Sequence, residues 1–135
     1  MTNNKRVVVT GLGAVTPLGC SFPEFWTNAL KGKSGVGPLT RFDTADYQVK
    51  IAAEIRDFVP ENHFDKKLTR RMDRFIQYAY AASLEAIRDA ELDLEKTDRT
   101  RAGILLGSGI GGLGTIEEQR LVQARRQSAR KYNAR

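Results

Sequence analysis

The sequence predicts an α/β protein in which at least some strands are parallel. Three observations support this fold class. The 135 residues are 41% apolar and 28% charged, which is a globular composition. Short apolar runs alternate with segments of helical periodicity in the order βαβαβα, and two of the runs end in glycines. A chain of this length is expected to form one domain that buries about two thirds of its unfolded surface.

Three segments are expected to be strands. Residues 6–10 form a β-branched run closed by Gly11 and Gly13, which is typical of a central strand buried on both faces. Residues 49–55 alternate between apolar and polar side chains, as in a strand nearer an edge. Residues 102–106 form the third run.

The first helix is expected after Ser21, which has the sequence of an N-cap. Pro23 lies in the first turn, and Glu24 is placed to reach back to the cap, as in a capping box. Gly32 is expected to end this helix.

Two further helices are expected. Residues 75–87 have helical periodicity, and their only charge is Glu85, so this helix should be packed on most faces. The other follows residues 107–112 and carries Glu117 and Glu118 in its early turns, where the helix dipole favours acids.

Both glycine-rich turns resemble nucleotide-binding loops, but neither fits one. In the first, the third glycine of G-x-G-x-x-G falls on Thr16, and Pro17 turns the chain away. Residues 107–112 match the letters, but no acid follows Glu118 to hold a ribose. Neither turn has the Lys-Ser/Thr pair of a P-loop. We predict no NAD(P), ATP or other cofactor, and we interpret the glycines as points of close backbone approach to a pocket wall or another chain.

The formal net charge of +6 comes from the end of the chain. Residues 1–118 contain 16 basic and 16 acidic residues, whereas residues 119–135 contain the other six basic residues and no acid. Such a block can bind phosphates or anionic lipid, but a solvated or poorly ordered end is commoner. We therefore expect no nucleic-acid or membrane partner, and we divide the chain into residues 1–122 and a basic tail, residues 123–135, expected to be poorly ordered.

Cysteine and histidine content excludes two kinds of site. Cys20 is the single cysteine, so no intrachain disulfide forms, and with the single histidine, His63, it cannot complete a four-ligand zinc site. We expect no metal. There is no run of about 18 apolar residues and no apolar core of a secretory signal, which favours a cytoplasmic protein.

Together the motifs resemble the β-ketoacyl-[acyl carrier protein] synthases, most closely the long-chain elongating type II. The resemblance covers roughly residues 5–122 in the family's order. It rests on RVVVTGLG at 6–13, TPLG at 16–19, FW at 25–26, Gly35, FD at 42–43, RMDRFIQY at 71–78 and GSGIGGL at 107–113.

The resemblance implies part of the first half of a thiolase-like fold, with a mixed or parallel sheet and packed helices, in a homodimer. It also implies decarboxylative condensation of an acyl thioester with malonyl-carrier in fatty-acid biosynthesis. That chemistry needs a thiolate at a helix N-terminus and two histidines. In the family they lie beyond the region that this chain covers. Cys20 is outside the family's nucleophile turn and His63 looks structural, so we expect no catalytic residue in these 135 residues.

Two sites are carried over from the resemblance. Ile110 matches a family residue that lines the acyl pocket near the dimer interface and gates chain length, although a plain packing residue fits the spacing equally. Lys67, Arg70 and Arg71, here called the basic patch, match residues that receive the acidic helix of acyl carrier protein. The alternative for these three residues is a solvated helix start.

The chain departs from the family at its end. Members usually have Gly-Pro-Arg-Arg or Gly-Pro-Arg-Lys and then Ser-Pro-Phe-Phe where this chain has residues 123–135. A truncated or frameshifted gene product would account for the length of the chain and for the concentration of its excess positive charge at the end.

The leading hypothesis is that the chain is the N-terminal portion of a 3-oxoacyl-[acyl carrier protein] synthase and is inactive alone. The alternative is a non-catalytic partner that binds acyl carrier protein or a full-length synthase, and an NAD(P)-dependent reductase is disfavoured by Thr16 and the missing acid.

Overall fold

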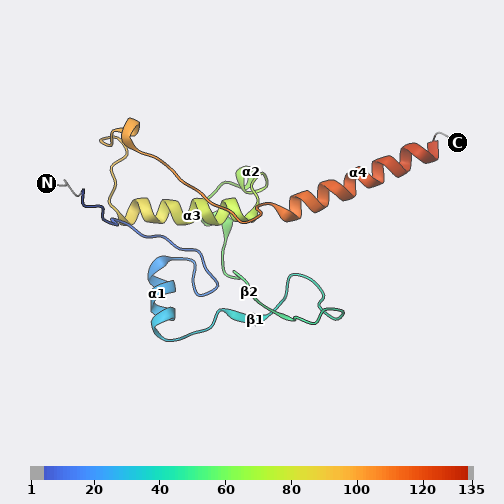
Figure 1. Cartoon of the computed structure of the whole chain (residues 1–135), viewed down its shortest axis with the longest axis horizontal. Helices are drawn as coiled ribbons and strands as arrows, with labels where there is room; N and C mark the ends of the chain where they lie inside the picture. Colours follow the sequence, from blue (N-terminus) through green and yellow to red (C-terminus); the bar gives the residue numbers. More distant parts are fainter. Residues whose placement is uncertain (1–4, 134–135) are drawn as a thin grey trace.

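The computed structural model describes residues 5–133, and their side chains as far as residue 126. Helix α3 (Arg74–Asp89) lies at the centre of the molecule (Figure 1). The N-terminal segment and α1 (Phe22–Leu30) lie below it in this view, and residues 102–112 return above it to its first turn. Helix α4 (Leu113–Asn133) then extends away from the rest of the chain.

Helix α1 begins where the sequence predicts. Ser21 is the extended N-cap, and its hydroxyl accepts a hydrogen bond from the Glu24 amide at 3.4 Å. The Glu24 carboxylate reaches back to the Cys20 amide at 3.0 Å, one residue earlier than in a standard capping box. Gly32, at φ +65, follows the last turn. The predicted bounds of this helix are confirmed because local capping fixes both ends.

The second predicted helix is present as α3, which contains all of residues 75–87. Its predicted packing is wrong, since only Gln77 and Ala81 are buried. The helix contacts residues 11–15, the start of α1, the segment before it and the turn at Gly111, while most of its side chains stay half-buried or exposed. Two short 3-10 turns, η1 (Pro60–Asn62) and η2 (Arg99–Arg101), and the short helix α2 (Lys66–Thr69) complete the helical elements.

The sheet differs most from the prediction. It has two strands, β1 (Val36–Pro38) and β2 (Ile51–Ala53), paired antiparallel with Gly37 opposite Ala52. Strand β2 lies within the predicted 49–55, but residues 6–10 and 102–106 are not strands. Val7 is 90% and Leu105 97% exposed. A strand buried on both faces needs neighbours for its backbone groups and side chains. Because residues 5–133 place none beside these runs, the predicted parallel or mixed sheet is not formed among them.

The buried core is small. Phe58, Phe64 and Ala81 are its buried apolar residues among those described. The chain exposes 12049 Å², whereas a compact monomer of this length exposes about 7,000 Å². The expected burial of two thirds of the unfolded surface is therefore wrong for this chain.

Helix α4 continues to Asn133 and so includes most of the basic tail. Residue 122 falls inside this helix, and the poor order expected of the tail stays a prediction. The division of the chain at that residue stays a prediction. No helix in the described range is both long and apolar enough to cross a membrane.

Candidate functional site

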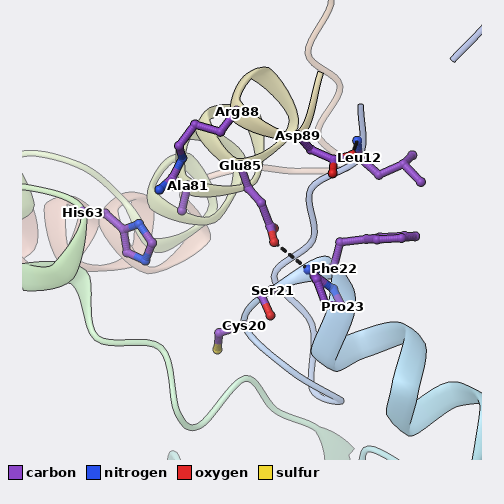
Figure 2. Close-up of a pocket in the computed structure, with 10 residues that line it drawn as sticks. All are labelled: Leu12, Cys20, Ser21, Phe22, Pro23, His63, Ala81, Glu85, Arg88 and Asp89. Carbon is purple, nitrogen blue, oxygen red and sulfur yellow. Dashed lines mark hydrogen bonds between the residues drawn. The ribbon is translucent and has the colours of Figure 1, made fainter. Parts of the chain in front are cut away.

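A cavity of about 490 Å³ lies between the start of α1 and the C-terminal half of α3 (Figure 2). Figure 2 shows Glu85 extending from α3 toward the first residue of α1, with Cys20 and His63 on other walls. The cavity therefore joins segments that are far apart in the sequence.

Two carboxylates on α3 hold the N-terminal segment. Glu85 accepts hydrogen bonds from the Ala14 amide at 2.9 Å and from the Phe22 amide at 2.8 Å. Asp89, one turn later, accepts from the Leu12 amide at 2.8 Å. The Phe22 amide is at the start of α1, where the helix dipole favours a carboxylate. These acids thus serve as acceptors for backbone donors of the N-terminal segment.

The first glycine-rich turn packs directly on α3. A Cβ on Gly11 would overlap the Ala86 carbonyl oxygen, and one on Gly13 would overlap the Ala82 carbonyl oxygen. The turn then reverses at Thr16 and Gly19, whose backbone groups exchange hydrogen bonds of 2.8 and 3.1 Å. For this turn, the interpretation of the glycines as points of close backbone approach is confirmed, with a helix as the surface approached.

Cys20 is poorly suited to nucleophilic attack. Burial raises the pKa of its thiol, and the negative charges of Glu24 and Asp57 raise it further. The His63 ring stacks on Phe58 with ring centres 5.2 Å apart, and no hydrogen bond joins it to Cys20. The two side chains share a cavity without forming a thiolate–imidazole pair.

The basic patch lies on α2 and the two residues after it. Lys67 is in the helix, Arg70 is its C-cap, and Arg71 follows; all three are exposed, and none forms an ion pair within the described residues. The Asp65 carboxylate caps the helix by accepting from the Leu68 amide at 2.7 Å. The patch is thus a compact group of accessible cations on a short, capped helix.

The side chain of Gln77 binds the backbone on both sides of Arg70 and Arg71. It is 4% exposed, and its side-chain nitrogen donates to the Thr69 and Met72 carbonyl oxygens at 3.1 and 2.9 Å. Sequence analysis missed this residue, as it missed the contacts of Glu85. In both cases the available signal was a polar group within a mostly apolar helical pattern.

Ile110 lies in the second glycine-rich turn and is 75% exposed. The turn is held near the start of α3, where the Asp73 carboxylate accepts from the Thr115 hydroxyl and Phe75 lies against Gly111. Ile110 is therefore at the same end of α3 as the basic patch, but it is not among the residues lining the cavity in Figure 2. Its role in an acyl pocket stays a prediction.

In the described part of the chain, no three His, Cys, Asp or Glu side chains come together in an arrangement that could hold a metal ion.

Comparison with known proteins identifies relatives of this chain. Residues 4–134 match the family model "Beta-ketoacyl synthase, N-terminal domain", so the match continues through most of the basic tail. The chain is 50% identical over 117 residues to 3-oxoacyl-[acyl-carrier-protein] synthase 2 of Staphylococcus aureus (strain COL). It is 43% identical over 118 residues to the protein of the same name from Synechocystis sp..

Each of these alignments covers 87% of this chain and 28% of the relative, so the chain spans little more than a quarter of their length. Among solved structures it is similar to the ishigamide ketosynthase/chain length factor, with a TM-score of 0.67 and 31% identity. That alignment covers 89% of this chain and 30% of the other. The described elements therefore correspond to one part of a larger ketosynthase fold.

Proposed function

Because this chain belongs to the β-ketoacyl synthase family, we propose that it forms the N-terminal part of a 3-oxoacyl-[acyl-carrier-protein] synthase. The observation that carries the proposal is the 50% identity over 117 residues to enzymes of that name. The reaction is the decarboxylative condensation of an acyl thioester with a malonyl thioester of acyl carrier protein, in the cytoplasm. As CO₂ leaves the malonyl group, its methylene carbon forms the new bond to the acyl carbonyl carbon, and the acyl–sulfur bond breaks to release the thiol that carried the acyl chain.

In that enzyme, these 135 residues would form part of the folded framework and the surface that binds acyl carrier protein. The nucleophile would come from the remainder of such a synthase, since Cys20 has a raised pKa and lies outside the nucleophile turn. Residues 6–10 and 102–106 would become strands of a thiolase-like sheet once neighbouring strands cover them. Their exposed Val and Leu side chains support this role. The whole enzyme would be a homodimer, as the resemblance implies.

The basic patch would receive the acidic helix of acyl carrier protein. Its three cations are exposed and lack an acidic partner among the described residues. Complementary charge of this kind steers and orients an encounter more than it adds affinity. Ile110, at the same end of α3, would face the acyl chain in the assembled enzyme.

A chimera tests the proposal. Residues 1–122 would replace the matching segment of the Staphylococcus aureus synthase, and ketoacyl product would be measured with acyl-carrier and malonyl-carrier substrates. We expect activity in the chimera and also in its Cys20→Ala variant, but none from the 135-residue chain alone. A chimera that folds and dimerises yet makes no product would contradict the proposal, as would product from the chain alone that disappears with Cys20→Ala.

A second candidate is a non-catalytic module that binds acyl carrier protein or a full-length synthase. The observation favouring it is the accessible basic patch, which needs none of the catalytic groups. Carrier binding by the 135-residue chain, together with an inactive chimera, would identify this function.

A further inference from the structure

Gln77 occupies an unusual position relative to the basic patch. The two carbonyl groups that it binds, those of Thr69 and Met72, stand immediately before Arg70 and immediately after Arg71. A single buried amide, 4% exposed, therefore holds the backbone at both ends of the dipeptide that carries two of the three cations.

The orientation of this amide is determined by its surroundings. If the group were turned over, its oxygen would face two carbonyl oxygens, and both contacts would be repulsive. In the observed orientation the Gln77 oxygen is buried and accepts no hydrogen bond from the residues that the structure describes. A buried acceptor without a donor costs free energy. An apolar side chain of similar length would avoid this cost, so packing alone does not explain a glutamine here.

The segment needs an anchor beyond its own helix. Helix α2 has only four residues, too few for a helix to be stable without tertiary contacts. The amides of Arg70 and Arg71 bond to the Lys66 and Leu68 carbonyl oxygens at 3.3 and 3.0 Å, within the same turn. Among the described residues, the side-chain hydrogen bonds from Gln77 join this turn to α3, beside the packing of Met72 against the core.

We infer that Gln77 is a positioning residue for recognition of acyl carrier protein, acting by holding the backbone of Arg70 and Arg71 in place before the partner arrives. The inference rests on the proposed role of the basic patch. Side chains carried on an ordered backbone lose less conformational freedom on binding, so the complex forms with higher affinity.

The test replaces Gln77 with methionine, which has a similar length but neither the donors nor the buried acceptor. We expect amide hydrogen exchange in residues 66–72 to become at least about tenfold faster. Affinity for purified acyl carrier protein should fall about three- to tenfold at low salt. The salt dependence should not change, because all three cations remain.

Two further variants serve as a control and a second probe. Ser83→Ala removes a hydrogen bond of 2.7 Å to the Ala79 carbonyl oxygen within α3 and should change neither measurement. Gln77→Asn keeps the amide but is too short to reach both carbonyls, so it should act in the same direction as Gln77→Met. If circular dichroism shows that Gln77→Met has lost its helices, the exchange rates and carrier affinity of Gln77→Asn test the inference instead.

Unchanged exchange in residues 66–72 would overturn the inference, and so would faster exchange with unaltered carrier affinity. The Arg70→Ala/Arg71→Ala variant separates the inference from the proposed function, because it should weaken carrier binding while keeping slow exchange. If the unaltered chain does not bind carrier protein, the proposed carrier contact is wrong and the role of Gln77 in recognition falls with it.

Discussion

At the residue scale, Glu85 joins two segments that lie more than sixty positions away in the sequence. Glu85→Ala leaves the amides of Ala14 and Phe22 without their acceptor. The free energy of local opening at these amides should fall by about 2–3 kcal/mol, because hydrogen bonds to a charged group are involved. Protection of the two amides from hydrogen exchange measures the loss.

Glu95→Ala is the matched control for this change. Glu95 forms an exposed ion pair of 3.3 Å with Arg99 and contacts nothing in the cavity. Its removal should alter opening by less than about 0.5 kcal/mol. Equal effects of the two substitutions would show that the contacts of Glu85 do not hold the N-terminal segment.

Gly13 tests the close approach of the first turn to α3. Gly13→Ala places a methyl group on the Ala82 carbonyl oxygen, which neither backbone can avoid without moving. We expect a destabilisation of about 1–3 kcal/mol, measured by exchange of the α3 amides. Gly114→Ala, where a new Cβ meets no atom within 4 Å, should instead stabilise α4 by up to about 1 kcal/mol.

At the element scale, Glu54 holds the loop between β1 and β2. Its carboxylate accepts from the Thr40 amide and hydroxyl and from the Arg41 amide, and it lies 3.6 Å from Arg56. The hydrogen bonds from the Thr40 hydroxyl and amide are the main cause of a lowered pKa for Glu54, to which the Arg41 amide and the charge of Arg56 add. The carboxylate thus binds its proton less readily when the loop is folded.

The sign of the pH dependence follows from this lowered pKa. The stabilisation is fully present above the ordinary glutamate pKa of about 4.3, and it is lost as the pH falls through the lowered value. Protection factors of the Thr40 and Arg41 amides should therefore decrease in acid. Glu54→Gln should remove this pH dependence and show low protection throughout. An identical acid profile in the variant would exclude Glu54 as the titrating group.

The helices and strands differ in how far the sequence alone predicts them. Helix α1 was predicted with its bounds because Ser21, Glu24 and Gly32 determine its ends within a few residues of the chain. Residues 6–10 and 102–106 carry an equally clear apolar pattern, but a strand exists only where a neighbour pairs with it. The resemblance predicts the basic patch as a site, and that role stays a prediction. Gln77 stands out as a polar residue in a mostly apolar helix, but its partners are backbone carbonyls, which no sequence pattern identifies.

At the scale of the whole molecule, the exposed area predicts self-association. The chain exposes 12049 Å², including Val7 and Leu105 at 90% and 97%. Exposed apolar side chains of this kind drive association. Sedimentation should show oligomers, and the double variant Val7→Lys/Leu105→Lys should shift the population toward monomer. A sharp, cooperative unfolding transition from a purified monomer would contradict this expectation.

At the same scale, two basic regions compete as the binding site for acyl carrier protein: the basic patch and residues 119–135. Each exposed charge pair contributes only about 0.2–1 kcal/mol, so binding should be sensitive to salt. Reversing Lys67, Arg70 and Arg71 to Glu should weaken binding of acyl carrier protein at low salt and leave the circular dichroism spectrum unchanged. Deleting residues 119–135 should leave most of the binding in place. If binding instead survives the charge reversal and disappears with the deletion, residues 119–135 are the binding element, and the basic patch has no part in carrier recognition by this chain.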